Sequence, residues 1–186
     1  MYETQHPVYN ELLKLGREIT HQVKPKAIVV FSAHWQSSRN TSEVNNASQT
    51  DLIYDFYGFP EHYYDHKYPN RGSPEVANHV ISTLKQNGIE AKGTKRGLDH
   101  GVYASFSILF KPDTNPANVP IVQVSLFDTD DADQHYRLGQ AIQSLREENI
   151  QLVCSGMAVH NLRDMFAARN SVGPMPYSVK IGRAHV

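Results

Sequence analysis

His34 is the residue of this chain best placed to do chemistry, because of the segment that precedes it. Residues 27–31 (Ala-Ile-Val-Val-Phe) form an apolar run rich in β-branched side chains, which is typical of a buried parallel strand. In open α/β sheets, ligands and catalytic groups collect at the carboxyl end of such strands. A histidine at this place is suited to be a metal ligand, a general base, or a hydrogen-bonded polar group without a function.

Two further histidines stand in related contexts. His160 follows a second buried run at residues 150–154, and His100 lies in a segment flanked by glycines that permits a tight turn. In a parallel sheet, His34 and His160 project from the same edge, and the turn can bring His100 to it. Asp99 is then placed either to orient a nearby ring or to anchor this loop. Two or three neutral imidazoles at one edge make a site for a first-row divalent metal ion.

Apolar periodicity and turn residues predict strands and helices in alternation along the chain. The expected strands are residues 26–32, 41–44, 89–95, 119–126 and 150–154. The expected helices are residues 6–21, 73–87, 102–110 and a segment from Asp130 or Asp131 to 145. This order predicts a single α/β domain with a largely parallel sheet flanked by helices. Residues 51–70 form a long aromatic loop, and a loop of this length in a compact domain is expected to be functional.

Composition narrows the classes of function. The 18 basic and 19 acidic residues are mixed along the chain without a basic tract, so no nucleic acid and no membrane surface is expected as a partner. No apolar run approaches the roughly 20 residues of a membrane-spanning helix. The single cysteine, Cys154, excludes an internal disulfide and fits a reducing compartment, so we expect a cytoplasmic protein.

Better-defined catalytic motifs are absent from the sequence. It contains no HExxH helix, paired CxxC zinc site, Walker loop or GxGxxG segment. Ser155 does not lie in a GxSxG elbow, because Val153 stands in place of the first glycine. The histidines therefore remain the main carriers of chemistry in this chain.

Five segments occur in the order in which they occur in the class III extradiol ring-cleavage dioxygenases. These segments are residues 31–35 (FSAHW), 54–60 (YDFYGFP), 68–75 (Tyr68-Pro69 to Gly72-Ser73-Pro74-Glu75), 98–101 (LDHG) and 156–163 (Gly156 through His160-Asn161-Leu162-Arg163). These motifs resemble those of the 4,5-DOPA extradiol dioxygenases and their bacterial relatives most closely, and the resemblance implies a fold of the type found in the B subunits of this class. The resemblance runs from about residue 1 to about residue 180.

The resemblance implies a mononuclear non-haem iron(II) enzyme that opens the ring of a small catechol, such as a DOPA-like compound, with dioxygen. Its partners would be a small aromatic diol and dioxygen, whereas the oligomeric state stays open. By resemblance His34 is a metal ligand, and His160 is a second-sphere acid/base residue or a second ligand. His100 would contact the substrate or the bound oxygen. Zinc(II) is the alternative metal, because imidazole suits both ions.

The same resemblance implies a set of residues that bind the substrate. Trp35 and Tyr57 are expected to form an aromatic wall around the ring, together with the other aromatic residues of the loop 54–70. Asp99 is expected to contact the substrate as well.

Two departures from the family pattern concern the remaining metal ligands. The family carries its first metal histidine in an N-terminal Ser-His-Gly-x-Pro segment, and its last ligand lies well beyond residue 186. We therefore expect residues 1–180 to be a catalytic domain that is truncated at both ends, and this chain alone to be inactive. Residues 181–186 (IGRAHV) are what one reading frame of a common sequencing adapter encodes, which makes a non-native tail the expectation and a divergent natural terminus the alternative.

A rival interpretation is an inactive remnant or metal-binding fragment of such an enzyme, or one part of a complex that another chain completes. A zinc-dependent hydrolase on a similar fold is a third interpretation. An in-frame Ser-His-Gly-x-Pro segment upstream in the genome favours the enzyme, and its absence favours the remnant.

Overall fold

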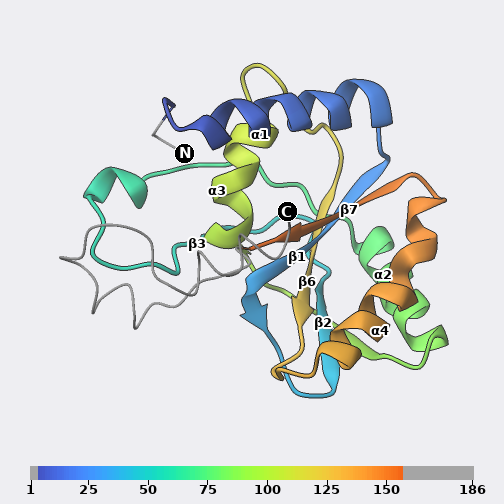
Figure 1. Cartoon of the computed structure of the whole chain (residues 1–186). Helices are drawn as coiled ribbons and strands as arrows, with labels where there is room; N and C mark the ends of the chain where they lie inside the picture. Colours follow the sequence, from blue (N-terminus) through green and yellow to red (C-terminus); the bar gives the residue numbers. More distant parts are fainter. Residues whose placement is uncertain (1–3, 157–186) are drawn as a thin grey trace, which may run out of the picture. The chain divides into compact units, whose positions relative to one another are not determined.

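The computed structural model describes residues 4–156, in which strands and helices alternate (Figure 1). The strands are β1 (Ala27–Gln36), β2 (Thr41–Asn45), β3 (Leu52–Ile53), β4 (Glu90–Thr94), β5 (Leu98–Asp99), β6 (Ile121–Leu126) and β7 (Ile150–Ser155). The α-helices are α1 (Pro7–Glu18), α2 (Pro74–Gln86), α3 (His100–Leu109) and α4 (Ala132–Ile142). Three short helical turns are η1 (Ile19–Val23), η2 (Glu61–Tyr63) and η3 (Gln143–Arg146). Within this part of the chain, no helix is long and apolar enough to cross a membrane.

The main sheet has five strands in the order β4-β2-β6-β1-β7. β1 is parallel to both of its neighbours, β6 and β7, and β2 is parallel to β4. β2 and β6 form the antiparallel pair. The largely parallel α/β sheet predicted from the sequence is confirmed, and β4 lies at one of its edges. A second sheet joins β3 and β5 in parallel and so ties the aromatic loop to the segment before α3.

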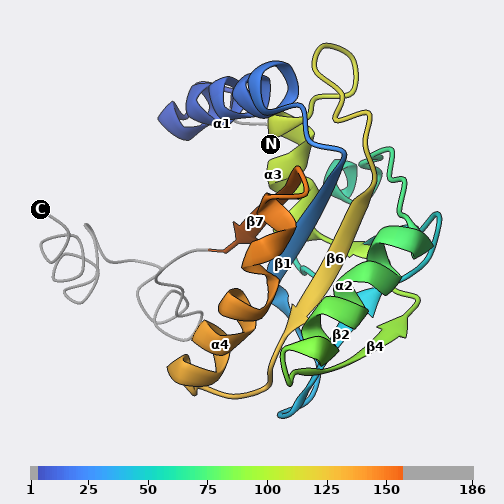
Figure 2. The same cartoon turned by 90° about the vertical axis from the view of Figure 1, so that its right-hand side faces the viewer.

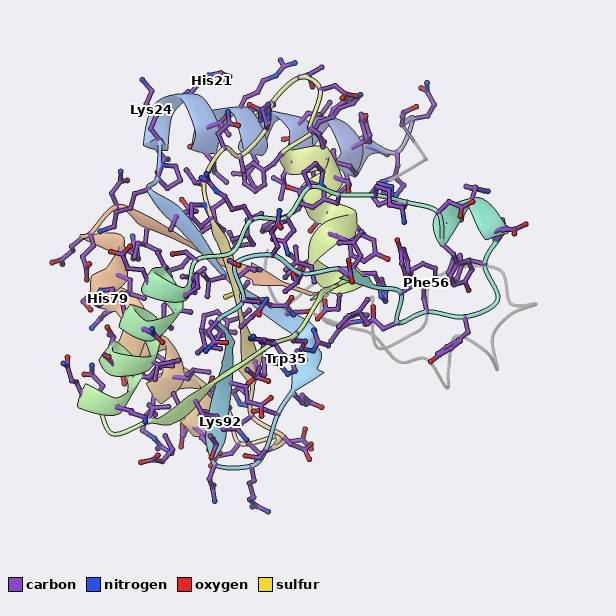
Figure 3. All side chains as sticks on the ribbon, turned by 180° about the vertical axis from the view of Figure 1, so that it is seen from behind. His21, Lys24, Trp35, Phe56, His79 and Lys92 are labelled. Carbon is purple, nitrogen blue, oxygen red and sulfur yellow. The ribbon has the colours of Figure 1, made fainter. Side chains whose placement is uncertain are left out.

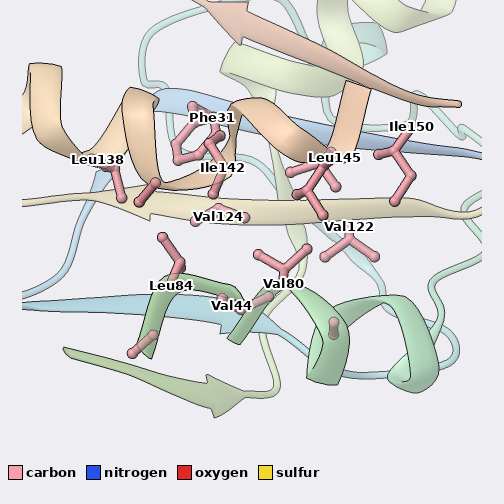
Figure 4. Close-up of a cluster of buried hydrophobic side chains, with 14 of the residues drawn as sticks. Phe31, Val44, Val80, Leu84, Val122, Val124, Leu138, Ile142, Leu145 and Ile150 are labelled. Atoms are coloured by element: carbon pink, nitrogen blue, oxygen red, sulfur yellow. The ribbon is translucent and has the colours of Figure 1, made fainter. Parts of the chain in front are cut away.

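Side chains on the two faces of β1 belong to two separate hydrophobic clusters, because successive residues of a strand point to opposite faces. Val29 and Phe31 pack in the cluster that contains residues of α2 and α4 (Figure 4). Ile28 and Val30 pack in the cluster that contains residues of η1 and α3, and Leu12 of α1 packs against this cluster. Helices therefore cover both faces of the sheet (Figure 2), which explains why this strand is apolar throughout rather than alternating.

Local sequence signals set the beginnings of two helices as predicted. Ser73 Oγ accepts the N–H of Val76 at the start of α2, where Pro74 occupies the first helical position. Asp131, rather than Asp130, caps α4, since its side chain accepts the N–H of Gln134. These caps satisfy backbone donors that lack partners in the first turn of a helix.

α3 differs from the prediction in its starting point. The helix begins at His100, not at residue 102, so this histidine is the first helical residue rather than part of a turn. Its two flanking glycines do not have positive φ values; they permit close approach instead. A Cβ atom at Gly97 would lie 2.4 Å from the carbonyl oxygen of Asp51. At the last residue of α3, Leu109, the backbone lies so close to α1 that a Cβ atom at Gly16 would clash with it. α1 and α3 are therefore in close contact at this point.

Candidate metal centre and active site

The segment Ser32-Ala33-His34-Trp35 lies in an irregular part of β1. Pairing between β1 and β6 is regular up to Phe31, which lies opposite Val124, and resumes only at Gln36, opposite Leu126. β1 thus has more residues than β6 across this interval, and the extra residues bulge from the ladder. β-Bulges bend a strand and re-aim its side chains, and they are frequent beside active sites. His34 is therefore inside the strand at its irregular end, and not after it as the sequence had indicated.

His34, Asp55 and His100 come together at this end of β1. One oxygen of the Asp55 carboxylate lies 3.0 Å from His34 Nδ1, and the other lies 2.8 Å from His100 Nδ1. The two imidazole rings meet edge to face, with centroids 4.2 Å apart. The three side chains are partly buried, each with 25–29% of its surface exposed. The predicted proximity of His34 and His100 is thus confirmed, and a carboxylate from the aromatic loop lies between them.

Asp55 also occupies the N-terminus of α3. Its Oδ1 accepts the backbone N–H of His100 at 3.0 Å, whereas the preceding residue Asp99 makes no capping hydrogen bond. Burial by itself raises the pKa of the Asp55 carboxyl, but the side-chain and backbone hydrogen bonds from His100 and its charge outweigh that effect. Together with the hydrogen bond to His34, they hold the pKa of Asp55 well below its usual range. The carboxylate is therefore ionised across the physiological pH range.

Asp99, the residue before His100, is fully buried. Its carboxylate accepts hydrogen bonds from Ser32 Oγ at 2.6 Å, Arg96 Nη1 at 2.8 Å and Gln123 Nε2 at 2.5 Å. Ser32 Oγ in turn accepts the backbone N–H of His34 at 3.1 Å. Of the two roles that the sequence allowed for Asp99, these contacts are those of an anchor, which links β1, β6 and the start of α3. Its contact with a substrate stays a prediction.

Trp35 lies among the strands, as Figure 3 shows, and only 5% of its surface is exposed. The guanidinium carbon of Arg96 lies 4.7 Å from the centroid of its ring, at the distance of a cation–π contact. Trp35 is thus held by the same arginine that pairs with Asp99. Its predicted contact with substrate is untested, and its surroundings indicate a role in fixing the end of β1.

The aromatic loop borders the histidine pair through Phe56. The Phe56 ring lies edge-on to that of His100, with centroids 5.1 Å apart, and it also packs against Phe59 and Tyr64. Tyr57, the next residue, is 90% exposed. An exposed aromatic side chain beside such a cluster is available for a flat apolar ligand, and the prediction that Tyr57 binds substrate stays open.

Gly101 makes room for this arrangement. A Cβ atom at this position would lie 2.8 Å from Ser32 Oγ, 2.9 Å from His34 Cδ2 and 3.1 Å from Asp99 Oδ1. Ser155 Oγ at the end of β7 donates a hydrogen bond to the carbonyl oxygen of Gly101. The glycine that the sequence analysis assigned to a turn is therefore required for the close packing of α3 on two strands.

His160 and the proposed tail, residues 181–186, lie outside the described residues. Two cavities among residues 4–156 have no histidine in their lining. A cavity of about 1010 Å³ lies against η3 and β7, and one of about 380 Å³ is lined by residues such as Asn70 and Phe110.

The donor set at this place suits a metal ion. His34, Asp55 and His100 each offer one ligand atom, and these atoms lie within 4.8 Å of one another. Imidazole and carboxylate are ligands of first-row divalent metals such as iron(II) and zinc(II). The same side chains are also hydrogen-bonded to one another through both Nδ1 atoms, which leaves the Nε2 atoms of the histidines without a hydrogen bond among the described residues. The site thus fits an imidazole-bound ion.

Asp55 was missed as a functional residue by the sequence analysis, which noted it only within the aromatic segment 54–60. The sequence contained one signal for it, since Asp55 is the only acidic residue in this aromatic segment and stands between Tyr54 and Phe56. An acidic side chain that becomes buried among apolar residues needs a polar partner.

Comparisons with known proteins show which family this chain is similar to. Residues 2–177 match the family described as the catalytic LigB subunit of aromatic ring-opening dioxygenase. A 4,5-DOPA dioxygenase extradiol-like protein of Schizosaccharomyces pombe is 40% identical over 161 residues, which are 86% of this chain and 52% of that protein. A 4,5-DOPA dioxygenase extradiol of Beta vulgaris is 40% identical over 152 residues, 81% of this chain and 54% of that protein.

A solved structure shows the same fold. The crystal structure of an uncharacterized protein from Escherichia coli K12 superimposes with a TM-score of 0.71 at 29% identity, covering 96% of this chain and 64% of the other. The chain spans about half the length of the curated relatives described above. The family match covers nearly all of its residues, and the chain therefore belongs to the LigB family, as a class III extradiol dioxygenase-like protein.

Proposed function

We propose that this chain provides part of the active site of a metal-dependent extradiol dioxygenase, which opens the ring of a small DOPA-like catechol with dioxygen. One observation carries the proposal: two histidines share a carboxylate at the carboxyl end of β1, beside an aromatic loop, in a chain of the LigB family. The names of the relatives support the type of substrate, since several are 4,5-DOPA dioxygenases.

His34 is the residue we assign to the metal, with iron(II) as the proposed ion and zinc(II) as the alternative. A divalent ion bound there would lower the pKa of the catechol hydroxyls and hold the diol and dioxygen together. The contacts of Ser32 hold His34 in place for this role. The Ser32 hydroxyl accepts the backbone N–H of His34 and donates to the buried carboxylate of Asp99.

The aromatic loop is proposed to position the ring of the substrate. Phe56 packs against His100, and Tyr57 projects into solvent next to it. A catechol is flat and apolar except at its hydroxyls, so stacking or edge contacts with such residues would orient its diol toward the histidines. Trp35 and Asp99 contribute by holding the end of β1 and the start of α3.

His100 and His160 are proposed to handle protons and oxygen. Because Nδ1 of His100 contacts Asp55, the Nε2 atom of His100 is the one that would contact the substrate or dioxygen. His160 is proposed to take a proton from the diol and return it after ring opening, as general acid/base residues do. The alternative is that His160 is a second metal ligand.

We also propose that residues 1–186 alone do not turn over. The sequence contains no Ser-His-Gly-x-Pro segment, and the resemblance assigns the first metal histidine to that segment. The single cysteine remains the basis for proposing a cytoplasmic location.

The proposal is tested with the gene product that carries this chain together with an upstream Ser-His-Gly-x-Pro segment. The protein is stripped with a chelator, refilled anaerobically with iron(II) or zinc(II), and mixed with DOPA and air. We expect uptake of dioxygen and a new ring-opened product with iron(II) only. A protein that is folded and iron-loaded yet consumes no dioxygen with any small catechol would overturn the proposal in favour of the remnant.

A further inference from the structure

The carboxylate of Asp55 has a place in the site that neither the family match nor the names of the relatives assign. It contacts two histidines from different elements, β1 and α3, through the same type of ring atom, Nδ1. Its third contact is the backbone N–H of His100. A carboxylate accepts hydrogen bonds but donates none when it is ionised, so each of these three groups must be a donor.

This requirement fixes the tautomer of both rings. A neutral imidazole carries its proton on one nitrogen and has a lone pair on the other. With the proton on Nδ1 facing Asp55, the lone pair of His34 and that of His100 are both on Nε2. Metal-ligating histidines commonly donate their other ring N–H to a carboxylate in this way, which fixes ring orientation and raises the basicity of the ligand.

We propose that Asp55 is the positioning residue of the site, and that its one carboxylate sets both His34 and His100 in the Nδ1–H tautomer. This inference deepens the proposed function and rests on it for the roles of the two Nε2 atoms. It also states that Asp55 is not itself a metal ligand. The Nδ1 atoms of His34 and His100 lie 3.0 and 2.8 Å from the two carboxylate oxygens of Asp55. Each of these oxygens therefore accepts an imidazole proton and does not bind the ion.

The substitution Asp55→Asn gives a specific expectation, because an amide has one acceptor and one donor end. The backbone N–H of His100 can only donate, so the amide oxygen is expected to stay on the side of His100. The amide NH₂ then faces His34 Nδ1, which must become an acceptor. His34 is therefore expected to change to the Nε2–H tautomer, while His100 keeps its proton on Nδ1. The variant Asp55→Ala removes the constraint on both rings.

The experiment is long-range ¹H–¹⁵N NMR of the imidazole nitrogens in the metal-free full chain. It is recorded at about pH 8.5, some two units above the ordinary histidine pKa of about 6.5. Loss of signals in His34→Gln and His100→Gln assigns the two rings among the ten histidines. Asp65→Asn is the matched control, since Asp65 is an exposed carboxylate in the same loop. We expect Nδ1–H for both rings in the wild type and in the control, and the change at His34 alone in Asp55→Asn.

Metal affinity of the iron- or zinc-loaded protein is the second readout. We expect Asp55→Asn to weaken affinity by about 10–100-fold, the usual effect of losing the partner of a ligating histidine, and Asp65→Asn to leave it unchanged. Nε2–H in either wild-type ring would overturn the inference, and this outcome does not depend on whether the variant folds. An unchanged His34 in a folded Asp55→Asn variant would overturn it as well. Metal loss as complete as in His34→Ala would make Asp55 a ligand and overturn it too. Correct tautomers, together with no ring cleavage by the gene product that carries the upstream Ser-His-Gly-x-Pro segment, would instead count against the proposed function alone.

Discussion

The imidazole rings of His34 and His100 stand nearly perpendicular, at 85°, with centroids 4.2 Å apart. One ring comes from the bulged end of β1 and the other from the first residue of α3. Two imidazoles at this distance would repel if both were protonated and unpaired, and the ionised Asp55 offsets that repulsion by accepting from both. The site therefore depends on the relative placement of two elements and a loop.

Substitution of His34 tests its role as a metal ligand. In the complete enzyme, His34→Ala is expected to abolish iron binding and activity while leaving the fold largely intact, because the side chain is partly exposed and not part of either hydrophobic cluster. Iron content by elemental analysis and the circular dichroism spectrum measure the two effects. His21→Ala is the control, since His21 is exposed in η1. Full metal content with normal turnover in His34→Ala would remove the residue from the site.

His160 is predicted to act on protons rather than to hold the metal. His160→Gln is expected to keep stoichiometric iron and to bind catechol, but to lose turnover by about 10²–10⁴-fold, the usual range for general acid/base catalysis. Iron content, catechol binding and the turnover rate are measured on the same preparation. Loss of the iron itself would place His160 among the ligands.

Two helical glycines form a matched pair for a test of packing at the site. Gly101→Ala is expected to destabilise the fold by about 1–3 kcal/mol, as overpacking does, because its Cβ would lie within 3.1 Å of side-chain atoms of Ser32, His34 and Asp99. Gly139→Ala in α4 meets no atom within 4 Å and is expected to stabilise by about 0.5–1 kcal/mol. Urea unfolding measures both variants, and equal effects of the two substitutions would contradict the close packing at Gly101.

A third histidine gives the fold a dependence on pH. His66 Nε2 lies 2.8 Å from Ser107 Oγ of α3, and burial lowers the pKa of its imidazole. The unfolded chain takes up a proton as the pH falls through about 6.5, whereas the folded chain does so only at lower pH. The contribution of His66 to stability is therefore present above that pH and is lost as the pH falls below it.

His66→Gln tests this dependence. The free energy of unfolding of the wild type is expected to fall more steeply between about pH 7 and pH 5 than that of the variant, on either side of the ordinary histidine pKa. The control is His21→Gln, which is expected to keep the slope of the wild type. A steeper slope in His66→Gln than in the wild type would show that the proton binds the folded state preferentially.

Sequence reasoning succeeded where the cause was local. The apolar run of residues 27–31 predicted the buried strand β1, and Ser73 and Pro74 predicted the start of α2, because caps and strand patterns depend on neighbouring residues. The end of β1 was not predictable in the same way. Its bulge depends on the register between β1 and β6, which are far apart in the sequence.

The candidate site was predicted in part for the same reason. His34 and His100 were singled out because each lies beside a recognisable strand or glycine signal. Asp55 lies in a loop without periodicity, and only the parallel pairing of β3 with β5 brings that loop to α3. The buried contacts of Asp99 likewise required the structure, since Ser32 and Gln123 reach it from two separate strands.

Isotope labelling tests the central claim, the extradiol opening of a catechol at His34, most directly. The iron(II)-loaded gene product that carries this chain is given DOPA and ¹⁸O₂, and the product is analysed by mass spectrometry beside that of His34→Ala. Because a dioxygenase transfers both atoms of one dioxygen molecule to the opened ring, we predict a product with two ¹⁸O atoms and none from the variant. An oxidised but unopened ring without ¹⁸O, or equal product from His34→Ala, would contradict the account.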